Sequence, residues 1–198
     1  GIETQNNIIV DMIGQQIVQQ PFMAVGAEYA SHTITSNFQN LATFFYTARS
    51  VTAAQTIDGI THTELVKTSS DSWAETNLEG ILNQVTPEFE DADQQGPVTL
   101  MVLAQNSSTS ARLAVVGDAD FAADGSFTAY GNSDLIINTI DWAVGQEDLI
   151  SLTAKSTTTR SLTLTPTTST LGLLFLISVI VVPAIALVLG AVAFIYRR

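Results

Sequence analysis

The stretch that decides the fold is Pro97 to Ala104, PVTLMVLA, followed after a polar turn by Ala111 to Val116, ARLAVV. Both are near-continuous apolar runs of strand length, a pattern typical of central strands that are covered on both faces. The turn between them, Gln105 to Ser110, is rich in Ser and Asn. The two runs predict an α/β fold built on an open sheet with flanking helices.

The sequence around these runs predicts the rest of the domain. Asn132 to Val144 carries apolar residues at helical spacing, so we expect a helix packed on the sheet, with Gly145 as its C-terminal stop. Alternating or apolar runs elsewhere indicate further strands. The other expected elements are strands over 7–12, 43–51 and 64–68, a polar loop over 69–75, a short helix over 78–85 and an edge strand over 150–152.

The chain divides by composition into four segments. Residues 1–152 are long enough for one α/β domain with a sizeable core. Residues 153–170 are dominated by Thr and resemble a stalk. Residues 171–196 are apolar, and Arg197 and Arg198 form a basic end.

The apolar segment Leu171 to Tyr196 contains no Asp, Glu, Lys, Arg, His, Asn or Gln. As a helix rising about 1.5 Å per residue it would cross about 30 Å of hydrocarbon, which predicts one transmembrane helix in contact with the lipid bilayer. The terminal arginines would stay on the cytoplasmic side. We therefore expect a single-pass protein of the cell membrane, with the bulk of the chain outside the cytoplasm.

Three residues of this segment bear on how such a helix would pack. Pro183 removes a backbone donor and predicts a kink near the middle. Gly172 and Gly190 leave small surfaces where another membrane helix could approach closely, although no strict G-x-x-x-G pair is present. Contact with another helix and exposure to lipid both remain open.

Charge and composition exclude several classes of function. All nineteen acidic residues but only five of the seven basic residues precede Leu171, so residues 1–170 carry a formal charge of −14. Such a surface repels polyanions, and we expect no nucleic-acid partner. The chain has no cysteine, which excludes disulfides, thiolate metal sites and a Cys nucleophile.

The first residues, GIETQNN, are polar and lack an apolar leader. A domain exported ahead of a C-terminal anchor needs an earlier targeting signal. An upstream segment that completes the sheet is therefore expected.

The acids Asp118, Asp120 and Asp124 lie in GDADFAADGSF, directly after the second apolar run. Carboxylates at the carboxyl end of a central strand lie where open α/β sheets bind ligands, and alternate acids followed by Gly are typical of calcium loops. The spacing departs from D-x-D-x-D-G, and no Glu follows at the expected position. Loop capping by these acids and a ligand or metal site are the two interpretations.

No catalytic motif accompanies these acids. His32 and His62 are the only histidines and lie outside any H-E-x-x-H pattern, and the chain has no G-x-S-x-G, G-x-G-x-x-G or P-loop. Neither an enzyme activity nor a cofactor is expected. Trp73, in the predicted polar loop, is the candidate for an exposed partner contact. Asn106-Ser107-Ser108 fits the glycosylation sequon.

The order of several short motifs is more specific than any one of them. These are HTIT from His32, TARS from Thr47, TSSDSWAE from Thr68, GPV from Gly96, RLAVVGDADF from Arg112, Gly131-Asn132, Asn138, Trp142, and the apolar end closing in Arg-Arg. This succession resembles the C-terminal half of the bacterial auxiliary proteins of gliding-motility-type ABC transporters, an extracytoplasmic family.

The resemblance implies a domain related to flavodoxin-like or glutamine-amidotransferase-like sheets, anchored near a transporter permease and without an established catalytic triad. Our first hypothesis is therefore a non-catalytic accessory subunit whose partners are other integral membrane subunits. A structural single-span subunit of another large membrane complex is the alternative. A third is a ligand-binding domain or hydrolase that uses Asp118, Asp120 and His32 in a cleft at the strand ends.

Overall fold

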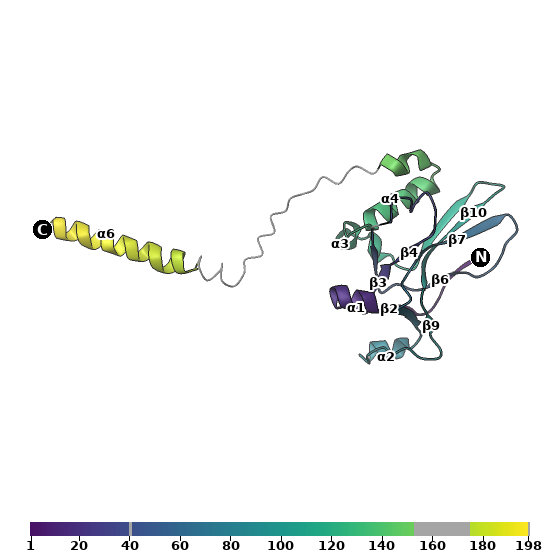
Figure 1. Cartoon of the computed structure of the whole chain (residues 1–198), viewed down its shortest axis with the longest axis horizontal. Helices are drawn as coiled ribbons and strands as arrows, with labels where there is room; N and C mark the ends of the chain where they lie inside the picture. The colour runs from purple at the N-terminus through teal and green to yellow at the C-terminus, as the bar shows by residue number, and fades with distance from the viewer. Residues whose placement is uncertain (40, 153–174, 198) are drawn as a thin grey trace. The chain divides into compact units, whose positions relative to one another are not determined.

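The computed structural model describes residues 1–39, 41–152 and 175–197 (Figure 1). By its contacts the chain divides into two units, Gly1–Ala154 and Lys155–Arg198. The first unit contains all the described strands, and the second contains the C-terminal helical segment.

The elements of the first unit follow one another in short alternation. In chain order they are β1 (Ile2–Thr4), β2 (Ile8–Asp11), α1 (Met12–Val18), β3 (Met23–Gly26), β4 (Glu28–Tyr29), β5 (Thr43–Tyr46), β6 (Val51–Ala53), β7 (Ile60–Lys67), β8 (Ser72–Glu75), α2 (Leu78–Leu82), β9 (Gln94–Gln95), β10 (Thr99–Asn106), β11 (Arg112–Val116), the 3₁₀-helix η1 (Asp120–Ala122), α3 (Asp124–Phe127), α4 (Asn132–Ala143) and the 3₁₀-helix η2 (Glu147–Leu152).

The largest sheet has four strands in the order β11-β10-β7-β4. β10 lies inside it, between β7 and β11, and Leu100 to Leu103 are at most 2% exposed. Because neighbouring side chains in a strand point to opposite faces, this burial means that β10 is covered on both faces, as predicted. β11 is an edge strand instead, and its Leu113 is 54% exposed.

The flavodoxin-like sheet is a wrong prediction, because every pairing among the described strands is antiparallel. β10 and β11 form a hairpin in which Leu103 faces Ala114, closed by the Asn106 N–H donating to the Ala111 carbonyl at 2.9 Å. A parallel connection needs a dozen or more residues, whereas only residues 107–111 join these strands. The length of the turn, which the apolar pattern obscured, decides the direction of pairing.

Three smaller sheets complete the unit: β1 with β6, β2 with β8 and β9, and β3 with β5. Two local predictions for this unit differ from the structure. The expected loop over 69–75 contains β8, which pairs with β2 in register Val10 to Trp73. The expected strand over 150–152 is the end of η2.

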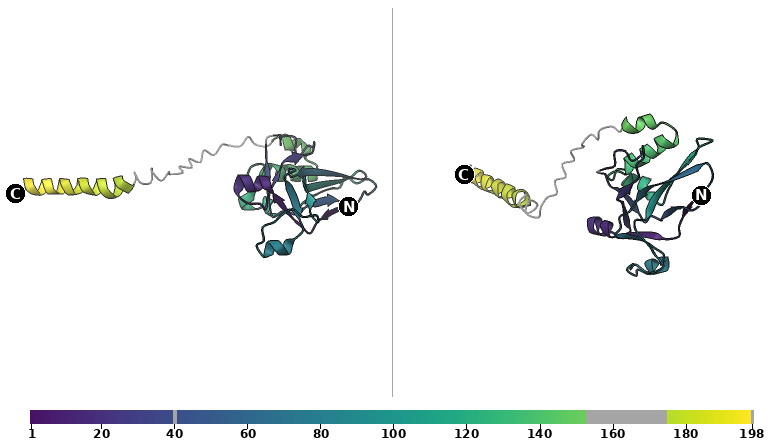
Figure 2. Two further views of the ribbon diagram at one scale, coloured as in Figure 1. Left: turned by 60° about the horizontal axis from the view of Figure 1, so that its bottom comes forward. Right: turned by 45° about the vertical axis from the view of Figure 1, so that its right-hand side comes forward.

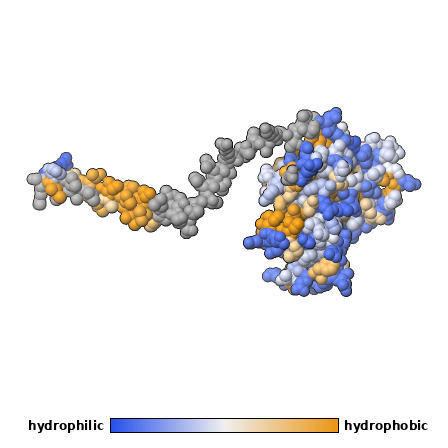
Figure 3. Space-filling view, viewed as in Figure 1, coloured by the Kyte–Doolittle hydropathy of each residue, from blue (hydrophilic) through white to orange (hydrophobic). Residues whose placement is uncertain are grey.

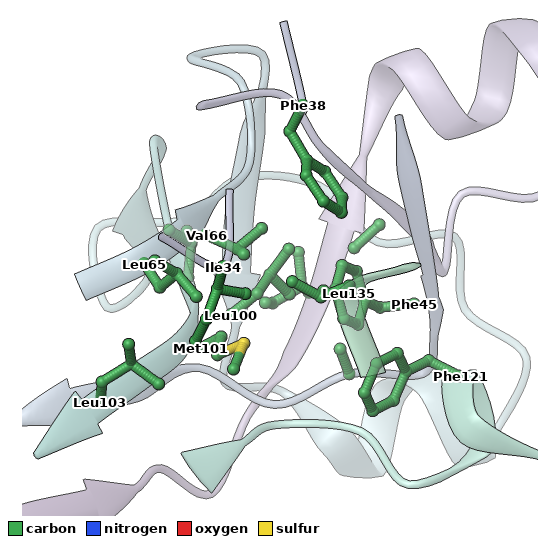
Figure 4. Packing of buried hydrophobic residues seen from close by; sticks show 14 of the residues in the cluster. Ile34, Phe38, Phe45, Leu65, Val66, Leu100, Met101, Leu103, Phe121 and Leu135 are labelled. Atoms are coloured by element: carbon green, nitrogen blue, oxygen red, sulfur yellow. The ribbon is translucent and has the colours of Figure 1, made fainter. Parts of the chain in front are cut away.

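The core lies between the four-stranded sheet and the segments that cover it (Figures 2 and 4). Leu100 and Met101 of β10 belong to it, together with Phe45 of β5 and Leu135 of α4. The rings of Phe45 and Phe121 pack with centroids 5.2 Å apart. The predicted helix over 132–144 is confirmed by α4, and Gly145 ends it with a positive φ of 77°.

One buried amide ties α4 to β5 across 88 residues of sequence. The Asn132 side chain is fully buried; its Oδ1 accepts from the Phe44 N–H and its Nδ2 donates to the Phe44 carbonyl, both at 2.9 Å. Nδ2 also donates to the Ser126 carbonyl at 3.1 Å. Asn132 thus completes the backbone hydrogen bonding of β5 where no neighbouring strand does so.

The second unit corrects the prediction for residues 171–196. A π-helix, η3 (Leu176–Val181), precedes α6 (Val182–Tyr196), which has 15 residues and spans about 22 Å at about 1.5 Å per residue. Among the described residues, no helix has both the length and the apolar character to cross a membrane, so the transmembrane helix is a wrong prediction.

Pro183 supplies a physical reason for the interruption. It lies in the first turn of α6, directly after the π-helical segment η3, and its missing N–H cannot bond to the carbonyl four residues before it. The exposed side chains of α6 are mostly apolar on the face in Figure 3. A Cβ built on Gly190 meets nothing within 4 Å. Gly172 lies outside the described residues.

Replacing Asn132 should test the bond between α4 and β5. Asn132→Ala leaves the buried Phe44 N–H and carbonyl without partners, so we expect the free energy of unfolding to fall by about 2–3 kcal/mol, since each such group costs about 1–3 kcal/mol. Urea unfolding of the full chain measures it. Asn83→Ala, at an exposed position, should change it by less than about 0.5 kcal/mol. Equal effects of the two substitutions would contradict the role given to Asn132.

Candidate functional site

A groove of about 800 Å³ lies beside the ends of β3 and β4. Its walls come from residues 25–32 and from the turns that follow, up to residue 42. Tyr29, His32 and Phe38 supply rings, while Ser36 and Gln39 are exposed at its surface. The lining mixes aromatic, aliphatic and hydroxyl groups, which is the composition of small-ligand and segment-binding sites.

Hydrogen bonds within the chain shape this groove. The Tyr29 hydroxyl donates to the Gly26 carbonyl at 2.9 Å and lies 2.9 Å from Thr43 Oγ1. Thr35 Oγ1 donates to the Ala30 carbonyl at 2.6 Å, which folds the segment after β4 back on itself. A Cβ on Gly26 would lie 2.3 Å from Thr43 Oγ1, so a glycine is needed for this close approach.

His32 connects the groove to a cluster of groups from three other elements. Its ring meets the edge of Trp142 at 5.6 Å, and the Arg112 guanidinium lies 5.3 Å from the centre of the same indole. Arg112 Nη1 donates to the Trp142 carbonyl at 2.5 Å, and Nη2 is 2.6 Å from Glu147 Oε1. The start of β11, the end of α4 and η2 are thereby joined at one point.

The protonation state of His32 follows from these contacts. Burial lowers its pKa below the ordinary value of 6.5; the Glu147 carboxylate opposes this and the Arg112 charge adds to it. His32 Nδ1 accepts from the Ile34 N–H at 3.2 Å, so the neutral ring carries its hydrogen on Nε2. His32 therefore offers a neutral N–H donor, and its one lone pair is already in use.

Of the three acids predicted to form a site, Asp118 holds the backbone. Asp118 Oδ2 accepts from the Tyr46 N–H at 2.9 Å, and Oδ1 accepts from the Asp120 N–H at 2.7 Å. Burial raises the pKa of Asp118, an effect that these bonds oppose. Asp120 is exposed, and Asp124 begins the backbone of α3. Loop capping therefore accounts for Asp118.

The structural context of these acids also differs from the prediction. They follow an antiparallel edge strand, so the rule that places ligands at the carboxyl ends of parallel strands does not apply. Within residues 1–39, 41–152 and 175–197, no group of three His, Cys, Asp or Glu side chains could hold a metal ion. His32, which the third hypothesis placed with Asp118 and Asp120, packs against Trp142 of α4.

Trp73 lies in β8 and is partly buried, in place of the exposed loop position expected. Its Nε1 donates to Glu75 Oε2 at 3.2 Å, and its ring meets the edge of Phe89 at 6.4 Å. Glu75 is 2% exposed, and its other oxygen accepts from the Asn77 N–H at 2.8 Å. A second cavity of about 380 Å³ borders Glu75, Glu88 and Glu90.

Sequence reasoning missed the groove and the cluster behind it. The sequence hypothesis grouped His32 with Asp118 and Asp120, whereas Arg112 and Glu147 belong to elements far along the chain and carry no motif. The only local signal was the run of turn-forming residues after Tyr29, which predicts a bend but no partner for it.

Comparison with protein-family models, with curated proteins and with solved structures finds no match. The resemblance carried by the order of motifs therefore remains a hypothesis.

Two neighbouring charges should move the pKa of His32 in opposite directions. In the wild-type chain we expect its imidazole to titrate below 6.5 in NMR spectra. Arg112→Gln removes a repelling charge and should raise this pKa, whereas Glu147→Gln removes an attracting charge and should lower it. Shifts of the same sign in both variants would rule out the cluster.

The lowered pKa of His32 also predicts how stability depends on pH. The unfolded chain binds this proton more readily than the folded chain, so the contribution of His32 to stability is present above pH 6.5 and is lost as the pH falls through its folded-state pKa. The free energy of unfolding should therefore decrease more on acidification from pH 6.5 in the wild type than in His32→Gln. Parallel curves from urea titrations would contradict this.

Proposed function

We propose that this chain is a non-catalytic accessory subunit of an ABC-type transport system. Its first unit would bind a partner or substrate outside the cytoplasm, at the groove beside Tyr29 and His32. The order of motifs motivates the choice of system. The hydrogen bonds within the groove motivate a binding role in place of a catalytic one.

One observation carries the proposal: the candidate general base of the groove and its buried hydroxyl groups are already engaged. His32 has given its lone pair to the Ile34 N–H, and a general base needs that lone pair free. The Tyr29 hydroxyl and Thr35 Oγ1 donate to backbone carbonyls. Exposed groups such as Ser31, Ser36 and Gln39 remain to contact a ligand, which favours recognition over catalysis.

The negative charge of the chain limits which partners can approach the groove. With a formal charge of −14 over residues 1–170, long-range repulsion disfavours an acidic partner and favours a neutral or basic one. Such steering is screened by salt, so association should slow as ionic strength rises.

A structural subunit of another large membrane complex is the second candidate, and α6 favours it. Leu187, Leu189 and Ile195 are 76%, 63% and 71% exposed. Apolar surface of this kind usually marks an interface. In that case the helix would be covered by other subunits, and the groove would play no part in assembly.

Isolation of the chain with its partners distinguishes the two candidates. From native membranes in mild detergent, we expect a permease and an ATPase to accompany the chain in stoichiometric amount, as identified by mass spectrometry. Ser36→Trp, which fills the groove from an exposed position, should lose them because the bulky ring occupies the binding space.

Thr56→Trp is the matched control, since Thr56 is exposed and outside the groove. Partners retained by both variants would refute recognition at the groove. Subunits of a different complex would favour the structural candidate, and a chain isolated alone would overturn the accessory role.

A further inference from the structure

The hairpin between β10 and β11 ends in an exposed tip. Asn106 closes β10, and residues 107–111 form the turn that leads to β11. The Ser110 N–H donates to the Asn106 carbonyl at 2.9 Å, which fixes the backbone of the turn. Ser107 to Ala111 are all exposed, so an enzyme can approach the tip without unfolding the sheet.

Of the two polar atoms in the Asn106 side chain, only the oxygen forms hydrogen bonds within the turn. Oδ1 accepts from the Ser108 N–H and from the Thr109 N–H, each at 2.9 Å. Among the described residues, Nδ2 has no hydrogen-bond acceptor. Since Oδ1 turns toward the backbone of the tip, Nδ2 is the end of the amide that is left for another molecule.

The two hydroxyl groups that follow Asn106 differ in the same way. Ser107 Oγ donates to the Gly59 carbonyl at 3.2 Å and braces the tip against the turn before β7. Ser108 Oγ has no hydrogen bond within the part of the chain that the structure describes. The hydroxyl two residues after the asparagine, which a glycosylation sequon requires, is therefore available.

Asn106-Ser107-Ser108 is the only Asn-X-Ser/Thr sequence in the chain. Asn132 and Asn138 show the contrast. Neither is followed by Ser or Thr two residues later, and both amides are buried and donate to backbone carbonyls. Accessibility and sequence therefore single out the same asparagine.

We propose that Asn106 is an acceptor for N-linked glycosylation. Its Nδ2 attacks the anomeric carbon of an oligosaccharide carried on a polyprenyl diphosphate. A carbon–nitrogen bond forms, the bond from that carbon to the diphosphate oxygen breaks, and the polyprenyl diphosphate leaves with the electron pair. Nδ2 loses one proton, and nothing is oxidised or reduced. In the cell this modification rests on the proposed location outside the cytoplasm, because the transferase acts on exported chains.

The test uses the full-length chain, a purified oligosaccharyltransferase and a polyprenyl-diphosphate oligosaccharide. Trypsin releases residues 68–112 as one peptide, since no Lys or Arg lies between Lys67 and Arg112. We expect this peptide to gain the mass of one oligosaccharide. Asn106→Gln should abolish the gain. Ser108→Ala, which removes a hydroxyl without a hydrogen bond, should also abolish it while leaving the unfolding curve unchanged.

Ser107→Ala and Ser108→Thr are the matched controls, and both should keep the modification because the sequon survives. The isolated 68–112 peptide is treated in parallel. Modification of the peptide but not of the folded chain would overturn presentation by the hairpin, and no modification of either would overturn the acceptor itself. Since this reaction needs no transporter, its failure is separate from failure of the isolation experiment above.

Discussion

The antiparallel ladder between β10 and β7 is the interaction on which the rest of the structure depends. β10 lies between β7 and β11, and its residues Leu100 to Leu103 are buried on both faces of the sheet. Both the partly buried β11 and the helix α4 take their places from this strand. The register of β10 against β7 shifts between Thr99 and Met101 and again between Met101 and Val102, and the apolar run stays buried through both irregularities.

Away from that ladder the strands are short, and carboxylates replace missing strand partners. Asp11 is fully buried and accepts from the Ile13 and Val25 N–H groups at 2.9 and 2.8 Å. Glu75 and Asp118 accept backbone N–H groups in the same way. Because unsatisfied backbone N–H groups are costly, Asp11 and Asp118 stabilise β3 and β5 by accepting from Val25 and Tyr46. Part of the acidic composition therefore serves the fold itself.

The same arrangement holds for Asp118, one of the three acids that suggested a binding site. A carboxylate whose oxygens are occupied by backbone donors has little capacity left for a metal or a substrate. The groove beside His32 differs from these carboxylates because some of its polar groups are free to contact a ligand. Its inner groups are satisfied, and its outer groups remain exposed. Recognition by shape and by a few hydrogen bonds is the role that such a surface supports.

Local pattern was sufficient for the elements with strong periodicity. The apolar run of β10, the helical stripe of α4 and the stop at Gly145 could all be predicted, because burial and backbone preference leave their mark within a few neighbouring residues. The sequence also contained the direction of the β10–β11 pairing, in the length of the turn between them.

Only the tertiary structure decided the candidate site. His32, Arg112, Trp142 and Glu147 come together from four segments, and no spacing in the sequence records that meeting. Likewise, the sequence predicted an exposed loop position for Trp73, which lies in β8 and pairs with β2. By itself the sequence determined composition, charge and the elements whose preference is local. Contacts between distant residues depend on how those elements pack, which is why groove, cluster and occupied carboxylates emerged only from the folded chain.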